Sequence, residues 1–164
     1  MRALAVVLVL AGASACAKSP RDATPTPSPV ATHAPDAARG SEVVITTPGG
    51  DLTVATEVVS TGAELERGLM FREFLAPDAG MLFLMGSDRD WAFWMRNTLI
   101  PLDMMFITKD LAIAGIAANA VPKTDTLRKV GAESRYVLEV NGGWCAQHGV
   151  TAGARVRFVA VTVP

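Results

Sequence analysis

Short runs of apolar and β-branched residues, each ended by a turn signal, dominate the chain from residue 41 onward. Runs of this length, several of them alternating between apolar and polar positions, predict β-strands. Pro48-Gly49-Gly50-Asp51 separates the first two runs and is typical of a hairpin turn. The predicted strands cover residues 41–47, 52–59, 80–85, 90–95, 103–108, 111–121, 136–140 and 155–163.

Two short helices interrupt this series of predicted strands. Thr61 and Glu64 have the spacing of a capping box, so we expect a helix to begin at Gly62 and to extend to Phe71. A second short helix is expected at residues 144–148, between glycines. About eight short strands with two short helices predict a mainly β single domain, small and barrel- or sandwich-like. Nothing in the spacing predicts a βαβ array.

The first 15 residues have the pattern of a secretory signal peptide. Arg2 precedes an apolar stretch at residues 3–11 that is too short to anchor in a bilayer, and small residues follow at 13–15. This ending, Ala-Ser-Ala before Cys16, is similar to a bacterial lipobox, which predicts lipidation of Cys16. The alternative is ordinary cleavage, which leaves Cys16 as an incidental thiol.

Residues 16–40 are rich in Ala, Thr, Ser and Pro, and no aromatic residue occurs before Phe71. A segment that cannot bury apolar surface is expected to form a disordered tether. Such a tether behind a lipid anchor holds the β domain, residues 41–164, off a membrane surface. We therefore expect an exported protein on the periplasmic or cell-surface face, anchored to the membrane through Cys16.

Composition sets two further limits on function. The 164 residues carry a formal net charge of −1, and 50% of them are hydrophobic. Lys and Arg form no cluster in the sequence, which argues against a nucleic-acid partner, because phosphate binding needs a concentrated basic surplus. About 120 residues remain after the tether, which is enough for one hydrophobic core.

The densest mixture of aromatic, methionine and polar residues lies at residues 90–106. Two hydrophobic runs there are joined by a polar elbow, Arg96-Asn97-Thr98, and Asp103 follows inside the second run. These polar groups are costly to bury unless they bond one another. The elbow is therefore either a polar network that fixes the fold or part of a binding site.

Four motifs occur in order along the domain: RGLMFR at 67–72, GMLF at 80–83, FWMRNTLIPLD at 93–103 and VLEVNGG at 137–143. Together they resemble the domain of unknown function 192 family (DUF192), from about Gly40 to the C-terminus. The resemblance implies a compact, mostly β, barrel-like domain that is often found behind a signal peptide. It implies no established activity, substrate or cofactor.

Eight residues form the candidate ligand-binding set, because they combine cations, carboxylates and hydrogen-bonding groups with an aromatic wall. They are Arg67, Arg72, Trp94, Arg96, Asn97, Thr98, Asp103 and Glu139. In one interpretation they line a pocket in which the arginines bind an anion or sugar hydroxyls beside the aromatic residues. In the other, Asp103 and Glu139 pair with the arginines, and the set is purely structural.

Other chemistries are compatible with the same chain. Asp103 and Glu139 suit an envelope hydrolase if they face each other as paired carboxylates. Cys145 and His148 have the residue types of a nucleophile and its base, although a buried thiol is the more common outcome. The methionines of the apolar runs are soft donors suited to Cu(I), but they are also ordinary core residues, and we assign no metal site.

These features favour a small-ligand or peptide binding module of the cell envelope, without a cofactor and more a binding protein than an enzyme. The partner expected is a small molecule or an envelope protein, with the membrane reached through the lipid on Cys16 and with no nucleic acid. The alternatives are the envelope hydrolase described above and a structural or assembly protein without a small-molecule ligand.

Overall fold

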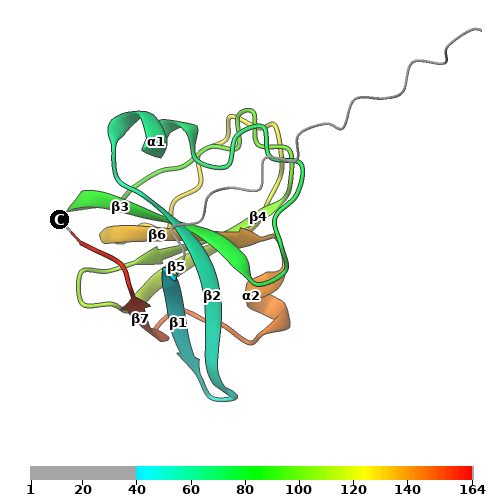
Figure 1. The fold of residues 1–164 in the computed structure, drawn as a ribbon. Coiled ribbons are helices and arrows are strands. Elements are labelled where there is room, and N and C mark those ends of the chain that lie inside the picture. The colour runs from blue at the N-terminus through cyan, green and yellow to red at the C-terminus, as the bar shows by residue number, and fades with distance from the viewer. Residues whose placement is uncertain (1–39, 164) are drawn as a thin grey trace, which may run out of the picture. The chain divides into compact units, whose positions relative to one another are not determined.

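The computed structural model describes residues 40–163, so Cys16 and the predicted signal peptide and tether lie outside the described residues. One seven-stranded sheet curls into a half-barrel and carries two short helices (Figure 1), which confirms the mainly β class. The elements in chain order are β1 (Glu42–Thr47), β2 (Gly50–Val59), α1 (Gly62–Arg67), β3 (Ala79–Arg89), β4 (Leu102–Ile107), β5 (Ile113–Ala120), β6 (Ser134–Asn141), α2 (Trp144–Gln147) and β7 (Arg155–Val159). No helix among residues 40–163 is long and apolar enough to cross a membrane.

The strands are ordered β5-β4-β6-β3-β2-β1-β7 across the sheet. β1 with β2 and β4 with β5 pair as antiparallel hairpins, as the turn signals predict. β2 and β3 instead pair in parallel, and the connection between them contains α1. The sequence gives no sign of this single crossover, because the six residues of α1 are far fewer than in the usual crossover helix.

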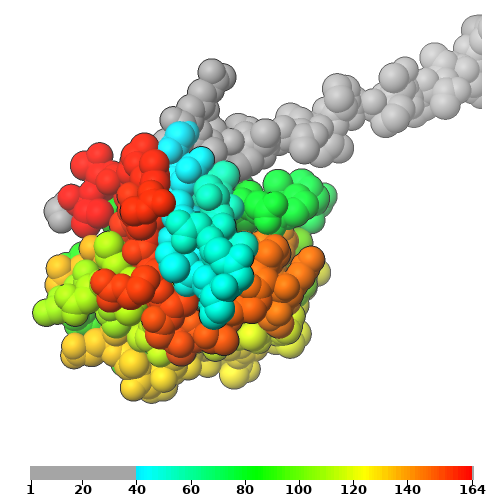
Figure 2. Space-filling view, turned by 90° about the horizontal axis from the view of Figure 1, so that it is seen from below, coloured from blue at the N-terminus to red at the C-terminus, as the bar shows by residue number. Residues whose placement is uncertain are grey.

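The two edges of the sheet meet at one end, which bends it toward a barrel. The Val156 amide donates to the Leu111 carbonyl at 2.9 Å, and the Ile113 amide donates to the Ala154 carbonyl at 2.9 Å. β1 also pairs with β7. Figure 2 shows the cyan surface of β1 and β2 lying against the orange-red C-terminal part of the chain. The chain therefore closes on itself at the end where β5 and β7 begin.

The curled sheet has two apolar faces, and each is covered by one helix. Met105 packs into a core with Trp144 of α2. Met104 packs into a second core with Leu65 of α1. Both methionines are fully buried, and they separate because successive side chains of a strand point to opposite faces. We call these two clusters the α2-side core and the α1-side core.

α1 ends at Arg67, short of the end predicted at Phe71. The next residue, Gly68, turns to a φ of +43°, and a β-carbon there would lie only 3.0 Å from the Cζ atom of Phe83. The chain therefore leaves the helix by bending onto the sheet at the one residue type that permits both the dihedral angle and the close approach.

We expect Gly68→Ala to lower the free energy of unfolding by about 1–3 kcal/mol, because alanine is strained at positive φ and its methyl group meets a packed ring. Gly62→Ala is the matched control. A β-carbon at Gly62 would meet open space, and Gly62 lies within the predicted capping box, in which the Thr61 amide donates to Glu64 at 3.1 Å. In urea denaturation, the free energy of unfolding of Gly62→Ala should equal or exceed that of the unmodified protein. Equal stability of the two variants would contradict this account.

The strand predicted at residues 90–95 is wrong. This segment makes one isolated bridge, in which the amide of Phe93 donates to the carbonyl of Arg128 at 2.9 Å. Phe93 and the fully buried Met95 point into the α1-side core, whereas Trp94 and Arg96 are exposed. The alternating pattern therefore has a different cause: the segment crosses over a face of the sheet and does not join the sheet.

Candidate functional site

A pocket opens over the α1-side core, between α1 and the segment at residues 92–98. Its volume is about 230 Å³. The apolar part of the lining comes from α1, β3 and two loops, and includes Leu65, Phe83, Met85, Phe93, Trp94 and Leu127. Sites for drug-sized ligands typically measure roughly 300–1,000 Å³, so this pocket suits a smaller molecule.

Glu139 of β6 is the acidic group on the sheet side of this pocket. Its side chain is only 4% exposed, and its cross-strand neighbours are Met81 of β3 and Met104 of β4. The Glu139 side chain forms no hydrogen bond or ion pair with any of residues 40–163, and it lines the pocket. Burial therefore raises the pKa of Glu139 from its ordinary value of 4.5 to about 8. The pocket holds a carboxyl group that is mostly protonated at neutral pH.

Aromatic rings form the wall opposite α1. Phe93 meets Phe83 edge to face, with ring centroids 5.2 Å apart, and it meets Phe106 in the same way at 5.9 Å. Trp94 is 39% exposed at the rim, and the guanidinium of Arg96 lies 4.2 Å from its ring centroid. Phe93 is therefore packed among other rings, whereas Trp94 is in contact with Arg96 and still has exposed surface at the rim.

Three further polar residues line the pocket. Thr98 is 5% exposed and supplies a hydroxyl group, which both donates and accepts hydrogen bonds. Glu66 and Arg67 of α1 are exposed and bring opposite charges. The structure therefore brings together four members of the predicted set: Arg67, Trp94, Thr98 and Glu139.

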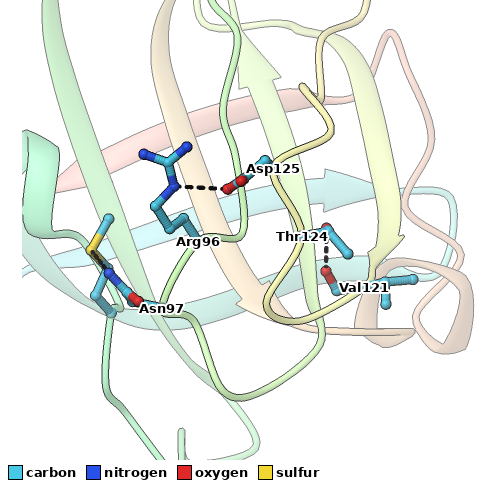
Figure 3. Close-up of polar contacts among 6 residues, drawn as sticks. Arg96, Asn97, Val121, Thr124 and Asp125 are labelled. Atoms are coloured by element: carbon cyan, nitrogen blue, oxygen red, sulfur yellow. Dashed lines mark hydrogen bonds and ion pairs between the residues drawn. The ribbon is translucent and has the colours of Figure 1, made fainter.

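Arg96 and Asn97 lie beside the pocket and do not line it. The Arg96 Nε atom donates to Asp125 at 2.7 Å, as Figure 3 shows, and this hydrogen bond raises the pKa of Arg96 and lowers that of Asp125. Asn97 has a φ of +59°, and its carbonyl accepts from the Phe71 amide at 2.8 Å. The predicted elbow is therefore a turn, held to its surroundings by a solvent-exposed ion pair and a backbone hydrogen bond.

Arg72 is engaged away from the pocket. Its guanidinium binds Glu57 of β2 through two hydrogen bonds, the longer of which measures 2.6 Å. Both side chains are mostly buried, with exposed fractions of 21% and 15%. Arg72 therefore ties the chain after α1 to the sheet, but through Glu57 and not through Asp103 or Glu139, the partners that the structural interpretation expects.

Asp103 is a structural residue on the opposite face of the sheet. It is fully buried, and its carboxylate accepts three backbone hydrogen bonds, from Asn119 at 2.7 Å, Gly143 at 2.9 Å and Cys145 at 2.9 Å. Asn119 lies at the bulge between β4 and β5, and Gly143 and Cys145 begin α2. Asp103 thus satisfies amides that a bulge and a helix start leave without backbone partners.

The paired-carboxylate hydrolase is not supported by this geometry. Met104 is the cross-strand partner of Glu139, and Asp103 is that of Val140. Asp103 and Glu139 therefore point to opposite faces of the sheet and share no cleft.

A family model matches the part of the chain that contains the four motifs. The model of the DUF192 family, described as "Uncharacterized ACR", matches residues 43–158. The chain belongs to the DUF192 family. A search of curated proteins finds no match.

Two solved structures are similar to this DUF192 domain. One is a protein of unknown function from Novosphingobium aromaticivorans, 40% identical, with a TM-score of 0.69 over 71% of this chain and 83% of that chain. The other, from Sinorhizobium meliloti, is described as a putative transcription regulator; it is 39% identical, with a TM-score of 0.68 over 73% of this chain and 93% of that chain. The likeness confirms the fold and leaves the activity open.

Cys145 and His148 do not form a nucleophile and base in this DUF192 domain. Cys145 is 2% exposed, and burial together with the neighbouring Asp103 carboxylate raises the pKa of its thiol. The His148 Nδ1 atom lies 2.9 Å from the Trp144 carbonyl oxygen, and its ring lies against the Trp144 indole. Since the thiolate is the reactive form, this thiol is inert.

A second cavity of about 330 Å³ lies beside α2, where Asp78, Asn141 and Trp144 line it. Its partly buried polar side chains already have partners, whereas Gln147 is exposed. The Asn141 amide group donates to the carbonyls of Leu75 and Ala76 at 3.1 and 3.0 Å, and the Trp144 indole donates to Asp78 at 3.2 Å. The pocket at Glu139 is therefore the stronger candidate site.

Apart from Trp94, the predicted set lacks the apolar members of the lining. Leu65, Phe83 and Met85 lie in a helix and a strand whose apolar positions are those of a core, so no local signal separates them from core residues. Leu127, which is 58% exposed, lies in a loop with no pattern of its own. The one local signal for the pocket is Glu139, a charged residue inside the apolar run 137–140.

Proposed function

We propose that this DUF192 domain is a small-ligand binding module, and that the pocket at Glu139 is its binding site. The observation that carries the proposal is a carboxyl group, 4% exposed and without a partner among the described residues, beside aromatic side chains. A buried polar group without a partner costs folding free energy, and such groups are concentrated at functional sites.

The positions of the four family motifs support the same pocket as the binding site. Each of the four motifs contributes to the pocket: Arg67 from the first, Phe83 from the second, Trp94 and Thr98 from the third, and Glu139 from the fourth. These segments are far apart in the sequence, and the fold brings them to one cavity.

Export and lipid anchoring belong to this proposal and rest on the sequence of residues 1–16. In this account the lipid on Cys16 and the tether present the pocket in the cell envelope. Cys16→Ala should move the protein from the membrane fraction to the soluble fraction without loss of the fold. Recovery of this variant in the membrane fraction would contradict the anchor.

We expect fragment screening by protein NMR to find small apolar ligands that shift the signals of Thr98 and Glu139. Trp94→Ala should weaken the binding of the best of these ligands by about tenfold, because the ligand loses one aromatic contact surface. Phe74→Ala is the matched control, since Phe74 is 72% exposed and does not line the pocket.

The ligand affinity of Phe74→Ala should equal that of the unmodified protein. Equal losses in the two variants would show that the ligands bind exposed aromatic residues in general. Ligands that leave the signals of Thr98 and Glu139 unchanged would also contradict the site.

A further inference from the structure

We propose that the pocket recognises a small organic ammonium ion, an amine carried on an apolar body, whose charged nitrogen pairs with the Glu139 carboxylate. This inference rests on the proposed binding function of the same pocket and names the chemical class of its ligand.

The carboxyl group of Glu139 has no partner among the described residues. Its neighbours across the sheet, Met81 and Met104, are apolar and buried, and they offer its carboxyl oxygens no donor. An ammonium group supplies both the positive charge and the N–H donors that a carboxylate accepts in its strongest hydrogen bonds. A carboxylate or phosphate ligand could accept only the single O–H of protonated Glu139, and it would place a like charge against the ionised form.

Aromatic side chains form one wall of the same pocket. Phe83, Phe93 and Trp94 line the pocket, and the faces of aromatic rings attract cations. Trp94 already shows this preference in the structure, because the Arg96 guanidinium lies 4.2 Å from its ring centroid. Rings beside an acidic group suit an organic cation, since its charged end and its apolar body are both accommodated.

Few other charges surround Glu139 in the pocket. α1 brings Glu66 and Arg67 to the lining, and both are exposed at the rim. The lining residues of β3, of the segment at 92–98 and of the loop at Leu127 are uncharged. Among the described residues no cation forms an ion pair with Glu139. The opposed charges of α1 offset each other, so Glu139, once ionised, sets the sign of the charge inside the pocket.

Binding of an ammonium ion then has a proton balance that is easily measured. Burial raises the pKa of Glu139 to about 8, so near pH 7 the free pocket holds mostly the neutral carboxylic acid. Pairing with a ligand that is already protonated requires Glu139 to ionise, and its proton passes to the buffer. At pH 9.5 the carboxylate is already ionised, and binding should release almost no proton from it.

The test uses three probes that carry the same phenyl ring: 2-phenylethylamine, 2-phenylethanol and phenylacetate. Titration calorimetry of the protein at pH 7, in two buffers of different ionisation enthalpy, measures affinity and proton release together. We expect the amine to bind at least about tenfold more tightly than the alcohol, with phenylacetate weakest. Glu139→Gln keeps the size and removes the charge, so it should reduce the amine to the affinity of the alcohol.

The outcomes separate this inference from the function on which it rests. Equal or tighter binding of the alcohol or the acid would overturn the ammonium preference while leaving a small-ligand pocket. Binding of the amine without proton release at pH 7 would also overturn it, and this readout needs no variant. If neither these probes nor any library fragment binds in the pocket, the proposed function itself fails.

Discussion

Asp103→Ala is expected to lower the free energy of unfolding by about 3–5 kcal/mol, because it removes a buried carboxylate that accepts from three backbone amides, one of them buried and two partly buried. The amides of Asn119, Gly143 and Cys145 all donate to this carboxylate, within 2.9 Å. Their loss loosens the bulge between β4 and β5 and the start of α2 together. Urea denaturation monitored by tryptophan fluorescence measures the change.

Asp110→Ala is the control for this substitution. Asp110 is an exposed carboxylate in the turn between β4 and β5, so its removal should leave stability nearly unchanged. An Asp103→Ala variant as stable as the Asp110→Ala variant would contradict the structural role, and would reopen Asp103 as a functional residue.

Glu139→Gln is expected to stabilise the protein increasingly as pH rises from about 5 to about 8. The pKa of Glu139 is about 8 in the folded protein against an ordinary value of 4.5, so in this window the folded state holds a proton that the unfolded state has lost. Stability of the unmodified protein therefore falls with rising pH, by about 1.4 kcal/mol per pH unit from this group, and by about 5 kcal/mol over the whole window at most.

Glutamine fills nearly the same volume and does not titrate, so the variant lacks this contribution. The difference between the two stability curves isolates Glu139, since all other titrating groups are shared. Glu66→Gln is the matched control, because Glu66 lines the same pocket but is exposed, and its curve should run parallel to that of the unmodified protein. Parallel curves for Glu139→Gln would mean that the carboxyl group is solvated.

The sequence predicts the elements of this fold better than their arrangement. Turn signals and capping residues act locally, so the hairpins β1–β2 and β4–β5 and the start of α1 are found correctly. The parallel pairing of β2 with β3 depends on contacts between distant segments, which no local pattern records. The segment at 90–95 alternates like a strand because it packs on a sheet face, and alternation alone does not distinguish the two cases.

The candidate site is predicted in part, for the same reason. A charge inside an apolar run marks both Asp103 and Glu139 as unusual, but the face to which each side chain points depends on strand register. The strand register directs Asp103 toward the backbone amides on one face of the sheet and Glu139 toward the pocket on the other face. Arg72 and Arg96 find carboxylate partners at Glu57 and Asp125, both outside the predicted set. Which residues meet is therefore a property of the fold, and the sequence supplies only the candidates.

The most direct test of the central claim is a pH titration of the side-chain carboxyl carbon of Glu139, followed by ¹³C NMR in the unmodified protein. The account predicts a midpoint near 8, because the carboxyl group is buried beside apolar side chains without a partner. Addition of 2-phenylethylamine should move this midpoint downward, since pairing favours the carboxylate. A midpoint near the ordinary value of 4.5 in the free protein would contradict the account, since Glu139 would then be solvated or already paired.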